Sequence, residues 1–209
     1  MITKLRNTEK HLHGLLSIKE WAFPTGSSNA TATSGNTITP TFPAIPPETE
    51  VTGELDDFFI DLKSSFEIFG QVINLVYLDP PLNEDDVTFF GIVKLMKIRK
   101  PNALLTAFLD STLNAQWFGD LKDFRERAYH QRNILWEISM KYSSVQATVY
   151  PQVSEISIPD NPFSNQPAFT QKRNVRNFCL PLLQSSLNAI DKSFGIIDVE
   201  VKNADKIPV

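Results

Sequence analysis

The sequence predicts a mainly α-helical fold, in which four or five helices form a bundle and a short β-hairpin is inserted before the last helix. Two observations predict it. From about residue 54 onward, apolar side chains recur at intervals of three and four, which is the spacing of a buried helix face. Between residues 145 and 158 the pattern changes to alternation, which is typical of strands. A chain of 209 residues is long enough to bury one substantial core.

The first quarter of the chain divides into two parts. Residues 2–23 predict a helix that ends at the Phe23-Pro24 pair. Residues 24–53 are rich in Ser, Thr and Pro and predict a long loop, because this composition buries too little apolar surface to fold alone. We therefore expect an N-terminal helix or arm (1–23), a loop or linker (24–53), a helical domain (54–201) and a tail (202–209).

The rest of the chain supplies the bundle. The predicted helices have approximate bounds of 53–76, 84–99, 102–114, 117–142 and 172–194. The predicted helix over 117–142 is the longest. Gln131 interrupts the apolar stripe along this helix, which consists of Leu121, Phe124, Ala128, Leu135, Ile138 and Tyr142. Residues 145–150 and 154–158 predict the two strands of the hairpin. Gly195 suits the end of the last helix, and residues 196–201 predict a closing strand.

Composition excludes several classes of protein. No apolar run approaches the roughly 18 to 20 residues that cross a bilayer. One cysteine, Cys179, excludes an internal disulfide and indicates a reducing compartment, so we expect a cytoplasmic protein with no membrane contact. His11 and His13 point to opposite sides of a helix, and no CxxC or HExxH pattern is present, so no metal or other cofactor is expected. The net charge of −4 argues against non-specific binding of nucleic acid.

The candidate catalytic and binding residues lie in the segment from Lys122 to Asn133. Here Arg125 is followed by four residues and then by His130. The segment also ends a basic cluster: Lys94, Lys97, Arg99, Lys100, Lys122, Arg125, Arg127 and Arg132. On a straight helix a five-residue step turns a side chain by about 140° and rises about 7.5 Å. Arg125 and His130 therefore converge only through the reach of the arginine, a helix irregularity or a dimer axis, and we expect the dimer.

The run Arg125-Glu126-Arg127-Ala128-Tyr129-His130, on a late helix of an all-α bundle, resembles the Arg-x4-His motif of the HEPN superfamily. The resemblance implies a metal-independent endoribonuclease that acts as a homodimer, with motifs from both protomers lining one cleft. It also implies RNA as substrate, a role as a toxin or defence effector, and a cognate antitoxin or regulator protein as partner.

The resemblance gives each motif residue a role. His130 would be the general acid and base, because an imidazole titrates near neutral pH. Arg125 would hold the scissile phosphate and the charge that develops on it. Arg127 and Asn133 would bond the phosphate or position His130, and Tyr129 would stack on a base.

Two alternatives remain. Glu126 stands where members of the superfamily often carry Asn, Asp or His, and an acid beside Arg125 competes with phosphate. The chain would then be a non-catalytic HEPN-like module that dimerises or binds a nucleotide or a partner protein, with Arg125, Glu126 and Arg127 in ordinary ion pairs. A hydrolase that uses Cys179 is disfavoured, because this residue lies in an apolar stretch that predicts core.

Overall fold

The computed structural model describes residues 1–17, 48–83, 87–131, 134–145, 148–163 and 171–204. The described helices are α1 (Ile2–Ser17), α2 (Glu48–Tyr77), α3 (Phe89–Arg99), α4 (Leu104–Leu113), α5 (Gln116–Glu126), a π-helical turn (Arg127–Gln131) and α6 (Val175–Ala204). The described strands are β1 (Glu137–Val145), β2 (Thr148–Pro159) and β3 (Lys172–Asn174). The predicted fold class is confirmed: the chain is mainly helical, and an antiparallel hairpin precedes the last helix.

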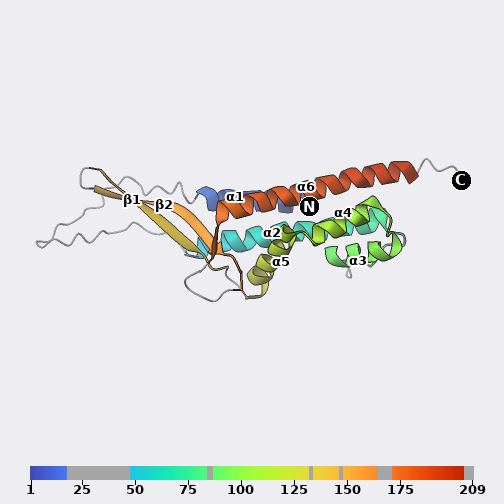
Figure 1. The fold of residues 1–209 in the computed structure, drawn as a ribbon, viewed down its shortest axis with the longest axis horizontal. Coiled ribbons are helices and arrows are strands. Elements are labelled where there is room, and N and C mark those ends of the chain that lie inside the picture. Colours follow the sequence, from blue (N-terminus) through green and yellow to red (C-terminus); the bar gives the residue numbers. More distant parts are fainter. Residues whose placement is uncertain (18–47, 84–86, 132–133, 146–147, 164–170, 205–209) are drawn as a thin grey trace, which may run out of the picture.

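Helix α2 is the centre of the bundle. Figure 1 shows α1 and α6 along one side of it, with α3 and α5 on the opposite side. Its inward positions recur at intervals of three and four and are almost wholly buried: Val51, Leu55, Phe58, Phe59, Leu62, Phe66, Phe69 and Ile73. A helix with so many apolar faces is stable only when other helices cover it on several sides, as they do here.

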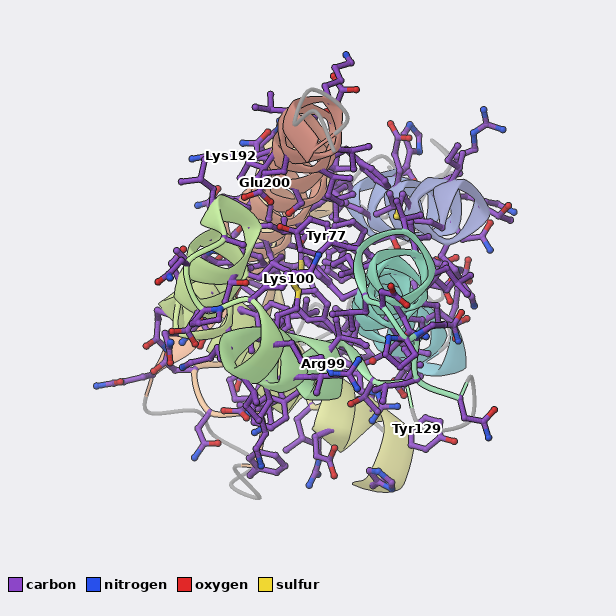
Figure 2. The ribbon with its side chains drawn as sticks, turned by 90° about the vertical axis from the view of Figure 1, so that its right-hand side faces the viewer. Tyr77, Arg99, Lys100, Tyr129, Lys192 and Glu200 are labelled. Carbon is purple, nitrogen blue, oxygen red and sulfur yellow. The ribbon has the colours of Figure 1, made fainter. Side chains whose placement is uncertain are left out.

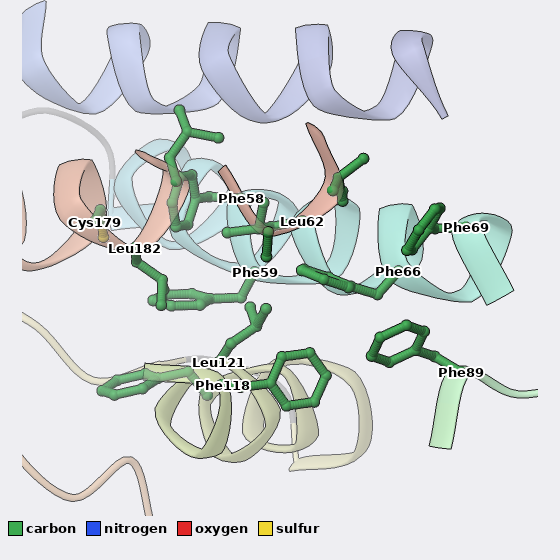
Figure 3. Close-up of a cluster of buried hydrophobic side chains, with 14 of the residues drawn as sticks. Phe58, Phe59, Leu62, Phe66, Phe69, Phe89, Phe118, Leu121, Cys179 and Leu182 are labelled. Atoms are coloured by element: carbon green, nitrogen blue, oxygen red, sulfur yellow. The ribbon is translucent and has the colours of Figure 1, made fainter. Parts of the chain in front are cut away.

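Aromatic rings of α2, α3, α5 and α6 close this core, and Figure 3 shows Phe59, Phe66, Phe89 and Phe118 among them. The Phe59 ring stacks on Phe124 of α5 with centroids 4.8 Å apart. The Phe66 ring meets Phe118 of α5 edge to face at 5.1 Å. The Phe69 ring meets Phe194 of α6 at 5.2 Å. These offset and edge-on contacts are the favoured arrangements of aromatic pairs, so α5 and α6 are each fixed against α2 by ring packing.

The hairpin projects from one end of the bundle (Figure 1). β1 and β2 are antiparallel, from the pair Glu137 and Ser157 to the pair Val145 and Thr148. The short strand β3 adds to the other edge of β2 and leads directly into α6. Arg173 of β3 fastens this edge, because its Nη1 lies 2.7 Å from Asp120 of α5 and its Nε contacts Asp160.

The predicted helix over 117–142 is wrong beyond its first half. Helix α5 ends at Glu126, a π-helical turn follows, and the chain enters β1 at Glu137. Leu121, Phe124 and Ala128 of the predicted stripe are buried, whereas Ile138 and Tyr142 lie on the strand. The predicted pairing of the strands over 145–150 and 154–158 is also wrong, because β1 ends at Val145 and most of both predicted strands lies on β2. The hairpin begins eight residues before the predicted start at 145, and its first strand comes almost wholly from the predicted helix.

The predicted end at Gly195 and the closing strand over 196–201 are also wrong, because α6 continues to Ala204. Interactions with other helices outweigh the poor helix propensity of glycine here. Ile197 is buried, and Glu200 accepts hydrogen bonds from the Tyr77 hydroxyl of α2 and from the Leu104 amide of α4. In Figure 2, Tyr77 and Glu200 lie together between these helices, with Lys100 beside them.

Element boundaries differ from those expected near both ends of the chain. Helix α1 packs against α2 and is described as far as Ser17, so the remainder of the predicted 2–23 helix lies outside the described residues. Helix α2 begins at Glu48, within the stretch 24–53 that the composition assigns to a loop. None of the described helices is both long enough and apolar enough to cross a lipid bilayer.

Candidate functional site

The outer side of α5 and the π-helical turn carries a cluster of four side chains, which we call the motif cluster: Arg125, Glu126, Tyr129 and His130. The Arg125 Nη1 atom lies 3.7 Å from Glu126 Oε2, and the His130 Nε2 atom lies 3.4 Å from Glu126 Oε1. The Arg125 guanidinium also lies 4.4 Å from the centre of the Tyr129 ring, and the His130 ring meets Tyr129 edge to face at 4.8 Å. Glu126 and Tyr129 thus each contact both predicted catalytic side chains.

Two contacts of the motif cluster join residues four apart, Glu126 with His130 and Arg125 with Tyr129, and a π-helical turn contains the second residue of each pair. A π turn bonds residues five apart instead of four, so it contains one residue more than an α turn. The helix is irregular at the motif, because the π turn begins two residues after Arg125 and contains His130, and both side chains contact the Glu126 carboxylate. A dimer axis is therefore not needed to bring the two side chains to one carboxylate.

Burial of the opposite face sets the orientation of the cluster. Phe124 and Ala128 are buried against the core, which leaves the adjacent Arg125 and Tyr129 on the outer side. In Figure 2 Tyr129 projects at the edge of the molecule, on the side away from α6. It is 57% exposed, and the His130 side chain is 55% exposed. A substrate as large as RNA can therefore reach the cluster.

Two hydrogen bonds hold the chain just beyond the turn. The Ile134 amide donates to Asp56 Oδ1 at 3.2 Å, and the Trp136 indole Nε1 donates to Thr52 Oγ1 at 3.0 Å. Sequence reasoning missed both acceptors. Their signal was a pair of polar residues four apart on α2, which places both on one face of the helix. With α5 packed on the core, the motif cluster is held from both sides, as an accurate site requires.

The charges of the cluster offset one another. Glu126 places its carboxylate between the guanidinium and the imidazole, so a bound phosphate must compete with it for Arg125. The same contact holds His130 by its Nε2 atom, which leaves Nδ1 on the other side of the ring. The arrangement can hold an anion and exchange a proton, the two operations that cleavage of a phosphodiester requires.

The other predicted site residues have different positions. Arg127 is half-buried and already engaged by a neighbouring group, so it is not a free cation. Asn133 lies outside the described residues, as does the side chain of Gln131. What can be described of the predicted site is therefore one cluster of a half-buried Arg125 and three exposed side chains, with Arg127 beside it.

The predicted basic cluster separates into groups with their own partners. At the end of α3, Lys97 pairs with Asp110 at 2.9 Å, and Arg99 donates to the Pro80 carbonyl at 2.6 Å. Lys100 Nζ lies 4.2 Å from the centre of the Tyr77 ring. These contacts tie α3 and its following turn to the bundle, so Lys97, Arg99 and Lys100 have structural partners away from the motif cluster.

Two other side chains that could react, Cys179 and His11, have structural roles. Cys179 is fully buried, and burial raises the pKa of its thiol, which disfavours the thiolate that a nucleophile needs. His11 Nδ1 lies 2.7 Å from Glu54 and joins α1 to α2. Within the described ranges, no group of three or more His, Cys, Asp or Glu side chains could hold a metal ion.

Comparison with known proteins identifies no matching family model, no matching curated protein and no matching solved structure.

Proposed function

We propose that this protein is a metal-independent endoribonuclease of HEPN type that acts as a dimer, and that Arg125 and His130 carry the reaction. The observation that supports the proposal is the meeting of these two side chains around Glu126 and Tyr129 on an exposed surface. The mainly helical bundle, with the motif on a late helix, is consistent with the resemblance that suggested it. A toxin or defence effector controlled by a cognate regulator is the corresponding biological role.

The reaction follows from the chemistry of the two groups. Arg125 binds the non-bridging oxygens of the scissile phosphate in place of the Glu126 carboxylate. The RNA 2′-oxygen attacks the adjacent phosphorus while its proton passes to the neutral imidazole of His130. The bond from phosphorus to the 5′-oxygen breaks, and that oxygen leaves with a proton from solvent. The products are a 2′,3′-cyclic phosphate and a 5′-hydroxyl.

Neighbouring residues contribute binding. The exposed Tyr129 offers a flat surface for a base, and stacking of this kind contributes about 1 to 3 kcal/mol for each base. Arg127 and Asn133 are proposed to bond the phosphate backbone or to position His130. The net charge of −4 means that RNA is attracted locally by these side chains and not by the protein as a whole.

Cleavage of a mixed RNA pool by the purified chain in EDTA tests the proposal. We expect cleavage with cyclic-phosphate ends in the wild type and a loss of about 100-fold or more in His130→Ala and Arg125→Ala. Lys122→Ala is the matched control, because Lys122 is an exposed cation of α5 outside the motif cluster. Intact RNA with the wild-type protein, or cleavage by the two variants at the wild-type rate, would contradict the catalytic assignment.

A non-catalytic helical module is the second candidate, and one observation favours it. Glu126 contacts both Arg125 and His130, which are the two groups that catalysis needs to have free. This candidate expects the wild type to leave RNA intact and to bind a nucleotide or a partner protein through the motif cluster. Binding that is lost in Arg125→Ala, without any cleavage in the wild type, would distinguish it from the ribonuclease.

A further inference from the structure

The face opposite the motif cluster carries an apolar groove between α1 and α6. Its volume is about 470 Å³, and its lining includes Leu5 and Leu16 of α1 and Leu180 and Leu187 of α6. Leu180 is 47% exposed, and Leu187 is 37% exposed. Figures 1 and 2 show the two helices side by side on the side of the molecule away from Tyr129. Exposed leucines on neighbouring ridges indicate a surface that another helix covers.

We propose that a second copy of this chain covers the groove, so that α1 and α6 of two protomers form a four-helix arrangement around a twofold axis. Two antiparallel helices with an apolar groove between them are half of such a bundle. A twofold interface must be self-complementary, and twofold dimers are the commonest oligomers of soluble proteins.

The charges on the groove rim meet this requirement. Arg6 and Glu9 both line the groove and lie three residues apart on α1. Neither forms an ion pair with another described side chain. When α1 packs antiparallel on its own copy with the axis between residues 7 and 8, Arg6 of each chain faces Glu9 of the other. One axis thus forms two ion pairs between the protomers.

The exposed leucines of α6 can pair in the same way, because both line the groove. Leu180 and Leu187 lie equally far from the midpoint between Leu183 and Gln184. A twofold axis through that midpoint therefore sets Leu180 of one chain against Leu187 of the other, twice. Contact between these exposed leucines would remove apolar surface from water on both protomers, which is the main driving force for association.

This interface has a consequence for the proposed reaction. The motif cluster lies on the opposite face, so each chain would work with its own Arg125 and His130 instead of sharing one cleft across the dimer, as the resemblance implies. The inference concerns the dimer of the proposed function but does not need the ribonuclease. Its test measures mass alone, so failure of the interface and failure of the catalytic proposal are separate results.

Light scattering after size exclusion, on the full chain over a range of concentrations, tests the interface. The wild type is expected to be a dimer. The double variant that combines Leu180→Asp with Leu187→Asp is expected to be a monomer. Phe90→Asp is the matched control, since Phe90 is 66% exposed on α3, outside the groove. Circular dichroism checks that each variant is folded. A monomeric wild type, or a folded double variant that remains dimeric, overturns the proposal.

A charge exchange tests the symmetry itself. Arg6→Glu alone and Glu9→Arg alone each place like charges opposite one another twice, which should weaken the dimer by about 10-fold. The double variant R6E/E9R restores opposite charges and should recover the wild-type dissociation constant. Equal weakening in the single and double variants would exclude the antiparallel contact of α1 with its own copy.

Discussion

Helix α5 has two sides that differ in what holds them. Its inner side, with Phe118, Leu121 and Phe124, is buried in the aromatic core around α2. Its outer side, with Arg125 and the π-helical turn, is exposed and held by charge and ring contacts. Burial dominates the stability of the first, whereas water weakens the ion pairs of the second. The motif cluster therefore depends on the core for its position but adds little to the stability of the fold.

The largest expected effect is in the core. Phe59→Ala removes a fully buried ring that stacks on Phe124, and it should lower the free energy of unfolding by about 3 to 5 kcal/mol. Tyr129→Ala is the matched control on the exposed side, and it should change the free energy by about 0.5 kcal/mol or less. Urea denaturation measures both. Comparable losses of unfolding free energy in the two variants would show that the two sides of α5 contribute equally to stability.

Substitutions of two glycines test the same difference in stability between a buried and an open position. A Cβ atom on Gly70 of α2 would lie 3.0 Å from the Phe89 Cα atom, so Gly70→Ala should destabilise the protein by about 1 to 2 kcal/mol. A Cβ atom on Gly119 of α5 has no heavy atom within 4 Å, so Gly119→Ala should stabilise the protein by up to about 1 kcal/mol. Thermal unfolding gives the sign of each change. A stabilising Gly70→Ala would show that α2 and α3 can move apart.

Tyr77 makes the buried side sensitive to alkaline pH. Burial, together with its hydrogen bond to Glu200, raises the pKa of the Tyr77 phenol above its ordinary value in the unfolded chain. The folded state therefore retains the phenolic proton to a higher pH than the unfolded chain does. The stability that this proton contributes is present below about pH 10 and is lost as the pH rises further. We expect the wild type to lose up to about 1 kcal/mol more than Tyr77→Phe between pH 9 and 11. Parallel pH profiles of the two proteins in urea would contradict this.

The smallest change in stability is expected at Glu126. Glu126→Gln removes exposed ion-pair contacts and should change the free energy of unfolding by less than about 0.5 kcal/mol. It should also free Arg125 and tighten RNA binding by about 2-fold to 5-fold, which fluorescence anisotropy measures at constant salt. Weaker RNA binding in this variant would mean that Glu126 supports the site instead of competing with the phosphate.

Much of the fold followed from the sequence, because long helices on a core repeat the same apolar spacing over many turns. The predicted helices over 84–99 and 102–114 contain α3 and α4 with small boundary shifts, and that over 53–76 overlaps α2. The error after Glu126 has a physical cause. Ile138 and Tyr142 are four apart, a spacing that fits a helix stripe and also, as an even number of residues, the alternation of a regular strand. Periodicity over so few residues does not distinguish the two.

The motif cluster was predictable in its residues but not in its geometry. Arg125 and His130 stood out by residue type and spacing, yet the π-helical turn has no reliable sequence signal. The error at Gly195 has a related cause. The apolar, β-branched run after it resembles a strand, but the contacts of Ile197 and Glu200 with other helices determine its structure. In both places tertiary packing decided what local preference left open.

The extra residue of the π-helical turn has a genetic consequence. Deleting the codon of Arg127, Ala128 or Tyr129 would convert the turn to an ordinary α turn and leave Arg125 and His130 four residues apart, on one helix face. Because the deletion removes only the residue by which a π turn exceeds an α turn, the chain beyond would keep its position. Trp136 would then still reach Thr52, and the first strand would enter the sheet in the same register. This segment can therefore lose one codon without a change in the register of the hairpin, whereas the spacing of the motif changes.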